Sequence, residues 1–190
     1  GDTRVLGLEL INEPFAGNLY RDPLLMVPRP NPHNADRVNL QPAYAKAAAA
    51  VRSVDPERLI FFDGVTWGDL GAGFDAAPAE NNTVLGFHYY APPQLEPEGG
   101  HASLQFKAQS RIAKKLGTGI FLTETSQPGP GKSGEVDSFS CSGCIGDAAD
   151  ASFVSWAGYE YKSFCRESAD TEAGQSQLAE WGACKTGYSK

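Results

Sequence analysis

Short apolar runs alternate along the chain with longer segments that have the composition of helices. The runs predict buried strands at residues 5–11, 59–62, 83–90, 119–123 and 153–161. Alanine-rich or amphipathic stretches predict helices at residues 39–54, 103–116, 147–151 and 175–181. Asn39 or Asp36 is the expected N-cap of the first helix, and Gly117 is the expected C-cap of the second.

Continuous apolar strands that alternate with helices are typical of a parallel sheet. Polar residues gather at the carboxyl ends of the predicted strands: Asn12, Glu13, Asp63, His88, Tyr90, Glu124 and Trp156. That edge carries the chemistry of a (β/α)8 barrel and the ligands of an open doubly wound sheet. A dinucleotide fingerprint and a phosphate-binding loop are both missing from the sequence. A barrel needs eight strands, so this chain would supply only part of one.

The composition narrows the classes of protein and of partner. A chain of 190 residues with 41% hydrophobic residues suits one domain with a sizeable core. The net charge of −7 argues against a nucleic-acid partner, which would require a basic face. Four cysteines are present, at positions 141, 144, 165 and 184, and they favour disulfides or inert thiols. Cys141 and Cys144 form a single C-x-x-C in a Gly/Ser-rich loop, which is weak support for a zinc or redox site.

Two carboxylates, Glu13 and Glu124, each follow an apolar run directly. A pair of carboxylates on either side of one bond is the minimal equipment for glycoside hydrolysis, because one stays protonated and the other ionised. Folding has to bring the two together, and a retaining mechanism predicts a separation of about 5 Å. A lone glutamate at the end of a strand is more often a surface residue, so the prediction depends on the combination.

Further polar and aromatic residues surround this pair in the predicted arrangement. Asn12 would hold a sugar hydroxyl, and Trp156 offers a flat apolar platform for a sugar ring. His88 and Tyr90 occupy alternate positions of one strand and therefore face the same side. The Tyr90 hydroxyl is expected to hold Glu124 by a hydrogen bond.

Asn12-Glu13-Pro14, His88-Tyr89-Tyr90, Glu124 after GIFLT, and Trp156 together resemble the motif series of glycoside hydrolase family 5. The resemblance implies a (β/α)8 TIM barrel, of which this chain would supply roughly the fourth to eighth strands. It also implies a retaining mechanism without metal or organic cofactor, with Glu13 as acid/base and Glu124 as nucleophile. Asn12 would bind the sugar 2-hydroxyl, His88 and Tyr90 would support the nucleophile, and Trp156 would line the glycone subsite.

Longer segments resemble the endoglycoceramidase branch and its glucocerebrosidase-like relatives, which cleave the β-glycosidic bond between a sugar and ceramide. They are LELINEPFAGNLYRDP, VDPERLIFFDGVTWGD, VLGFHYYAPPQ, FLTETS and SWAGYEYKSF, from about Val5 to Tyr161. Gln94, at the end of the third segment, is expected to contact substrate. The implied partner is a glycolipid or oligosaccharide. The alternatives are a family 5 endo-β-glucanase or mannanase, and a binding protein that kept the pocket and lost turnover.

The resemblance makes residues 1–190 the C-terminal part of a catalytic barrel whose first three strands are absent. We therefore expect the chain to be inactive without the missing N-terminal half. Leu24, Leu25, Met26 and Val27 would either line a lipid groove, with peripheral contact to a membrane surface, or pack their loop onto the barrel. The N-glycosylation pattern Asn81-x-Thr83 and the four cysteines favour a secreted or lumenal location, with a cytosolic one left open.

Overall fold

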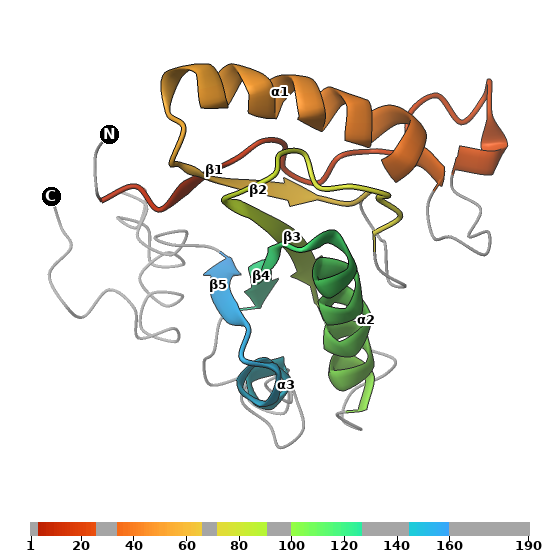
Figure 1. Cartoon of the computed structure of the whole chain (residues 1–190). Helices are drawn as coiled ribbons and strands as arrows, with labels where there is room; N and C mark the ends of the chain where they lie inside the picture. The colour runs from red at the N-terminus through yellow and green to blue at the C-terminus, as the bar shows by residue number, and fades with distance from the viewer. Residues whose placement is uncertain (1–3, 26–33, 66–71, 91–99, 127–144, 160–190) are drawn as a thin grey trace, which may run out of the picture.

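A computed structural model describes residues 4–25, 34–65, 72–90, 100–126 and 145–159 (Figure 1). The strands are β1 (Gly7–Glu9), β2 (Leu59–Asp63), β3 (Thr83–Tyr89), β4 (Gly119–Ser126) and β5 (Ser155–Tyr159). The helices are η1 (Pro23–Leu25), η2 (Asp36–Leu40), α1 (Gln41–Val54), α2 (Gly100–Leu116) and α3 (Ile145–Ser152).

All four strand pairs are parallel, and the order in the sheet is β1-β2-β3-β4-β5. Each strand therefore lies beside the strand that precedes it in sequence, as in a (β/α)8 barrel. A doubly wound sheet would instead reverse its strand order at a switch point. The arrangement confirms the predicted fold, a partial (β/α)8 barrel.

Two apolar clusters join one face of the sheet to the helices. Under α1, Tyr44 packs against Phe62 of β2 and against Phe74, with ring centroids 6.2 and 6.0 Å apart. Under α2 and α3, Phe87 of β3 meets Phe106 edge to face at 5.3 Å. Ile120 of β4 packs against both clusters, so a continuous layer supports the strands from outside.

The opposite face of the sheet carries a different set of side chains. Phe61 neighbours Phe62 in β2 and so points away from the helices. It meets Phe121 of β4 edge to face, with centroids 5.7 Å apart. Asp63 and Glu9 follow Phe61 and Gly7 by two residues in their strands and therefore share this inner face.

The structure corrects the predicted start of the first helix. The π-helical turn η2 runs directly into α1, and no side chain caps α1. Asp36 is fully buried, and its carboxylate accepts hydrogen bonds from the backbone N–H groups of Val65 and Gly73 at 2.7 and 2.6 Å. Asn39 donates to the Ala16 carbonyl at 2.8 Å. Both candidates for the cap therefore tie distant loops to the helix and do not cap it.

Other boundaries agree with the sequence or shift by a few residues. Gly117 ends α2 with a φ of +69°, the left-handed conformation expected of a C-cap glycine. The first strand is shorter than predicted and ends at Glu9, whereas β4 extends to Ser126. Glu124 therefore lies within its strand and does not follow it. The helix predicted at 175–181 and the four cysteines lie outside the described residues.

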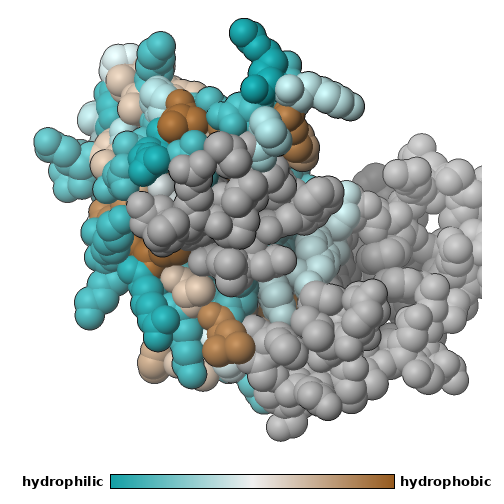
Figure 2. Space-filling view, turned by 90° about the vertical axis from the view of Figure 1, so that its right-hand side faces the viewer, coloured by the Kyte–Doolittle hydropathy of each residue, from teal (hydrophilic) through white to brown (hydrophobic). Residues whose placement is uncertain are grey.

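Of the predicted apolar loop, the structure describes the packing of Leu25 alone, and Met26 and Val27 lie outside the described residues. Leu25 is 6% exposed and belongs to the core cluster under α1, which favours the packing interpretation for that residue. On the face shown in Figure 2, hydrophobic residues form separate patches among hydrophilic ones. Within the described residues, no helix combines the length and the hydrophobicity that crossing a membrane requires.

Candidate active site

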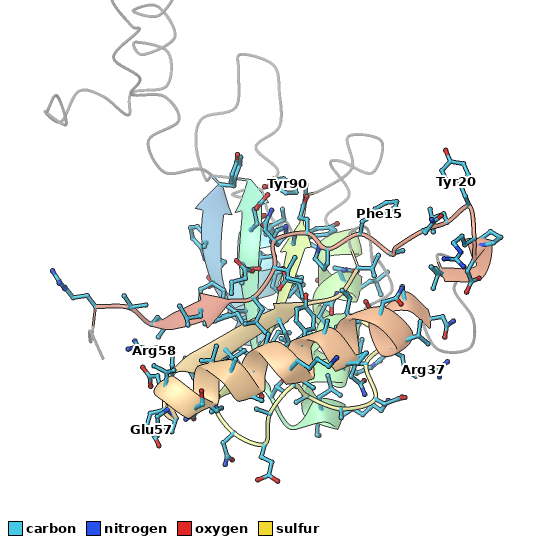
Figure 3. All side chains as sticks on the ribbon, turned by 90° about the horizontal axis from the view of Figure 1, so that it is seen from above. Phe15, Tyr20, Arg37, Glu57, Arg58 and Tyr90 are labelled. Carbon is cyan, nitrogen blue, oxygen red and sulfur yellow. The ribbon has the colours of Figure 1, made fainter. Side chains whose placement is uncertain are left out.

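Glu13 lies on the segment that follows β1 and crosses the carboxyl end of the sheet. Figure 3 shows this segment passing beside Tyr90 and continuing through Phe15 to Tyr20. Glu13 has a φ of +42°, which is uncommon for a residue with a side chain and costs on the order of 1–3 kcal/mol. Such strain persists where the surroundings fix the backbone, and the Glu13 side chain here contacts His88 of β3. The buried ring of Pro14 follows directly.

Glu124, unlike Glu13, lies within a strand, β4. Its backbone is the register partner of His88, and the pairing is irregular on both sides of it, after Phe87 in β3 and after Leu122 in β4. Irregularities of this kind re-aim a side chain at the edge of a sheet. The side chain of Glu124 is 19% exposed, compared with 43% for that of Glu13.

Tyr90 donates a hydrogen bond of 2.6 Å from its hydroxyl to Glu124 Oε1, as expected from the sequence. Burial raises the pKa of Tyr90, and the hydrogen bond to Glu124 and the charge of that carboxylate raise it further. The phenol therefore remains a donor at physiological pH. Oε1 is occupied by this bond, which leaves Oε2 as the available oxygen of Glu124.

His88 lies between the two glutamates. Its Nδ1 is 2.9 Å from Glu13 Oε1 and 3.7 Å from Glu124 Oε2. The sequence predicted a contact with Glu124, but the closer partner is Glu13. One oxygen from each glutamate and this nitrogen all lie within 4.8 Å of one another. This closest approach of two oxygens is compatible with the close spacing of the carboxyl groups in retaining glycosidases, about 5–5.5 Å.

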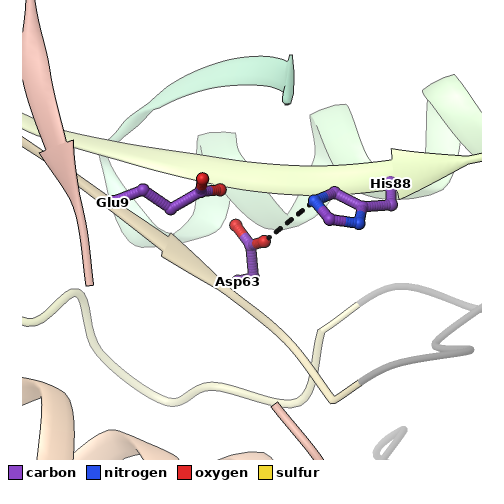
Figure 4. A group of neighbouring side chains, drawn as sticks. All are labelled: Glu9, Asp63 and His88. Atoms are coloured by element: carbon purple, nitrogen blue, oxygen red, sulfur yellow. Dashed lines mark ion pairs between the residues drawn. The ribbon is translucent and has the colours of Figure 1, made fainter. Parts of the chain in front are cut away.

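Two acidic residues without a predicted role complete the group. Asp63 is 4% exposed, and its Oδ2 lies 3.5 Å from Nε2 of His88. Glu9 of β1 stands on the far side of Asp63 (Figure 4). The pKa of Asp63 is well above its usual range, because burial and then the charge of Glu9 disfavour ionisation. A charged residue inside an apolar run was the sequence signal for Glu9.

The remaining predicted residues have different positions. Asn12 is exposed directly before Glu13, and Trp156 of β5 is 38% exposed. Gln94 lies outside the described residues. Two trios bring potential metal ligands within 4.8 Å, Glu9 with Asp63 and His88, and Glu13 with His88 and Glu124. Such spacing can hold a cation, and the second trio is also compatible with the close placement of an acid and a nucleophile.

Comparison with known proteins agrees with this fold and shows the family of the chain. Residues 1–164 match the family described as cellulase (glycosyl hydrolase family 5), and the chain belongs to that family. The endoglycoceramidases of Cyanea nozakii and Hydra vulgaris are 40% and 39% identical to it over 164 residues. The match covers 84% of this chain but only 30% and 29% of those proteins, so the chain spans about three tenths of their length.

A solved structure resembles the fold at much lower sequence identity. It is the cellulose synthase subunit Z from Clostridioides difficile, with a TM-score of 0.57 and 20% identity. The match covers 83% of this chain and 54% of that one. It supports the architecture of the described strands and carries no information on substrate.

Proposed function

We propose that Glu13 and Glu124 are the acid/base and the nucleophile of a retaining β-glycosidase. The observation that carries the proposal is the approach of their oxygens to within 4.8 Å of each other around His88. The assignment of roles follows from their surroundings. Glu124 is the less exposed carboxylate and is fixed by the Tyr90 hydroxyl, as a nucleophile that must attack one atom should be. Glu13 is more exposed and can reach a leaving group that departs into solvent.

In the first step, Glu124 Oε2 attacks the anomeric carbon while the bond from that carbon to the aglycone oxygen breaks. Glu13 gives its proton to the departing oxygen, so the aglycone leaves as a neutral alcohol. The products are a glycosyl ester on Glu124 and an ionised Glu13.

In the second step, Glu13 removes a proton from water, and the water oxygen attacks the anomeric carbon of the ester. Glu124 leaves as a carboxylate, and its bond to the Tyr90 hydroxyl stabilises the charge that returns to it. Two inversions restore the original β configuration. Neither step requires a metal ion.

The substrate we propose is a glycosphingolipid, cleaved between its sugar and ceramide. The support is the name of the two relatives that are about two fifths identical to this chain. The family description, cellulase, favours an endo-β-glucanase or mannanase as the second candidate. Trp156 would line the glycone subsite in either case.

The catalytic unit we propose extends beyond these strands. Within the described residues β1 pairs with β2 alone, and Leu6, Leu8 and Ile11 beside its open edge are 64%, 45% and 42% exposed. Further barrel strands would cover this edge and complete the sugar site. We expect residues 1–190 alone to show no turnover and a polypeptide that supplies those strands to be active.

The test uses such a longer polypeptide and three substrates: a glycosphingolipid, a cellooligosaccharide and mannan. Release of ceramide supports the first candidate, and depolymerisation of either glycan supports the second. Proton NMR of the first product should show the β anomer before mutarotation. The α anomer as first product would contradict retention, and turnover of none of the three would favour a silent binding protein.

The location we propose is secreted or lumenal. Asn81, the acceptor of the glycosylation pattern, is exposed in the turn before β3, where a glycan can be attached. Expression in a secreting eukaryotic cell should give a protein whose electrophoretic mobility shifts on treatment with a peptide N-glycosidase. Asn81→Gln should remove that shift, and an unchanged shift in the variant would place the glycan elsewhere.

A further inference from the structure

Asp63 is an acidic residue of the inner face that the reaction itself does not use. It ends β2, directly behind His88, and Glu9 of β1 lies on its other side (Figure 4). One side-chain oxygen or nitrogen atom from each of the three residues lies within 4.8 Å of the others. Any role for Asp63 in the chemistry must therefore pass through His88, and this inference rests on the function proposed above.

One oxygen of Asp63 poses a problem if both acidic residues are ionised. Oδ1 is buried and has no hydrogen-bond partner among the described residues. A Cβ added to Gly86 would lie 2.0 Å from this oxygen, so Oδ1 occupies the space that a side chain at position 86 would fill. Ionised carboxylates only accept hydrogen bonds, so Glu9 could not satisfy Oδ1, and the two charges would repel each other.

We propose that Asp63 and Glu9 share one proton, and that the pair is a positioning device that holds His88 through its Nε2–H. The shared proton turns the repulsion between the carboxyls into a hydrogen bond and satisfies Oδ1. Oδ2 then accepts from Nε2, 3.5 Å away. With Nε2 held, the imidazole ring directs Nδ1 at Glu13 Oε1, 2.9 Å away.

The groups that surround Asp63 are consistent with a bound proton. Glu9 of β1 and Glu124 of β4 face it from two strands, with Glu13 behind His88, and all three carboxylates raise its pKa. Among the described residues, His88 is the basic side chain within ion-pair distance of the Asp63 carboxyl group. On the helix side, Tyr44 donates to the Asp63 backbone carbonyl at 2.9 Å and leaves the carboxyl group unneutralised.

The first test compares two substitutions of Asp63 in the complete enzyme. Asp63→Asn can still donate to Glu9 and accept from Nε2, so it should keep most of the activity. Asp63→Leu releases Nε2 and should lower kcat about 10²-fold, the scale of a misplaced catalytic group. The loss in kcat should be confined to substrates with a poor leaving group. A dinitrophenyl glycoside should be spared, because its leaving group needs no protonation by Glu13. Equal losses on both substrates would indicate a merely structural role and overturn the proposal.

Asp36→Leu is a matched control, because Asp36 is also fully buried but its carboxylate binds backbone N–H groups away from His88. It should lower the melting temperature, and any change in kcat should be the same for substrates with a good and with a poor leaving group. If the folded Asp63→Asn variant were as inactive as the Asp63→Leu variant, the result would show that an ionised carboxylate is required. Should the leucine variant not fold, Glu9→Gln provides the test, because its amide can supply the hydrogen to Oδ1 and should preserve activity.

The second test does not depend on activity. At neutral pH the infrared spectrum should contain the carbonyl band of a protonated carboxylic acid that is lost in both Asp63→Asn and Glu9→Gln. The band should remain in Glu13→Gln, which separates it from the acid/base. Its absence would overturn the shared proton, as would a loss of activity on chelation that zinc restores. The band in a protein without glycosidase activity would contradict the proposed function and leave the carboxyl pair intact.

Discussion

The two faces of this sheet are built from the same strands but carry side chains of opposite character near the carboxyl ends, apolar on one face and polar on the other. On the outer face Phe62 and Phe87 bury aromatic rings against helices, and the contacts are between apolar groups. On the inner face Asp63 and His88 lie one residue further along the same strands and form a polar pair. One Asp63 oxygen of this pair is buried and has no hydrogen-bond partner within the described residues. The alternation of side chains in a strand separates stability from chemistry by a single position. Substitutions on the two faces should therefore have separable effects on folding and on turnover.

The largest expected effect is on the inner face, at the glutamates. In the longer, active polypeptide, Glu124→Gln removes the proposed nucleophile without a change in size. It should lower kcat by at least about 10⁴-fold, because covalent attack is lost altogether. Glu13→Gln should lower kcat about 10²–10⁴-fold on unactivated glycosides, the usual contribution of an acid/base. Both variants should melt close to the wild type by calorimetry. Turnover within tenfold of the wild type in either variant would refute the assignment of that residue.

The largest expected effect on stability is on the outer face. Phe62→Ala removes a fully buried ring that contacts Tyr44 and Phe74 and should cost about 3–5 kcal/mol of unfolding free energy. The measurement is denaturant unfolding, with activity expressed per folded molecule. That activity should be unchanged, because Phe62 points away from the site. A fall in kcat of the folded fraction would show that the two faces are coupled.

Tyr90→Phe should have an intermediate effect, confined to the inner face. It removes the donor of a 2.6 Å hydrogen bond to Glu124, and bonds to charged groups contribute about 1.5–3 kcal/mol. We expect a comparable increase in the activation free energy, visible as a lower kcat with little change in KM. Thermal stability should change little, because Tyr90 is 41% exposed. An equal loss in stability and in rate would argue that Tyr90 is a structural residue.

The smallest expected effect is an increase in stability from Asp63→Asn. The raised pKa of Asp63 means that the native state binds a proton which the unfolded chain releases above about pH 4. Stability is therefore lost as pH rises from there through the raised folded pKa, and asparagine removes that loss. The free energy of unfolding of the variant, relative to that of the wild type, should increase as pH rises. Below about pH 4 the difference between the two should not depend on pH. A constant difference between pH 4 and 8 in urea unfolding would contradict a proton held at Asp63.

The strands of this sheet could be predicted from the sequence, but some contacts on its inner face could not. The strands were predictable because parallel strands covered by helices read as apolar runs, as the segment from Thr83 to Tyr89 does. The proximity of Glu13 and Glu124 was predictable because glycoside hydrolysis, the chemistry that the sequence suggested, requires two carboxylates close together. The contact of Glu9 with Asp63 depends on the register of β1 against β2, which places Glu9 opposite Phe61, and no local pattern encodes that register. Similarly, Asp36 has the residue type of a cap, but a distant loop determines its partners.

Gly86 has a consequence for how this family can vary. Its missing side chain leaves the space that the Asp63 carboxyl group fills, so an alanine at position 86 would collide with Oδ1. The two positions are therefore expected to covary among homologues: a larger residue at 86 should accompany a smaller one at 63. Such a pair of exchanges would remove the acidic group behind His88 and leave both glutamates in place. Homologues could thus diverge in the pH range of their activity without any change in the residues that touch the sugar.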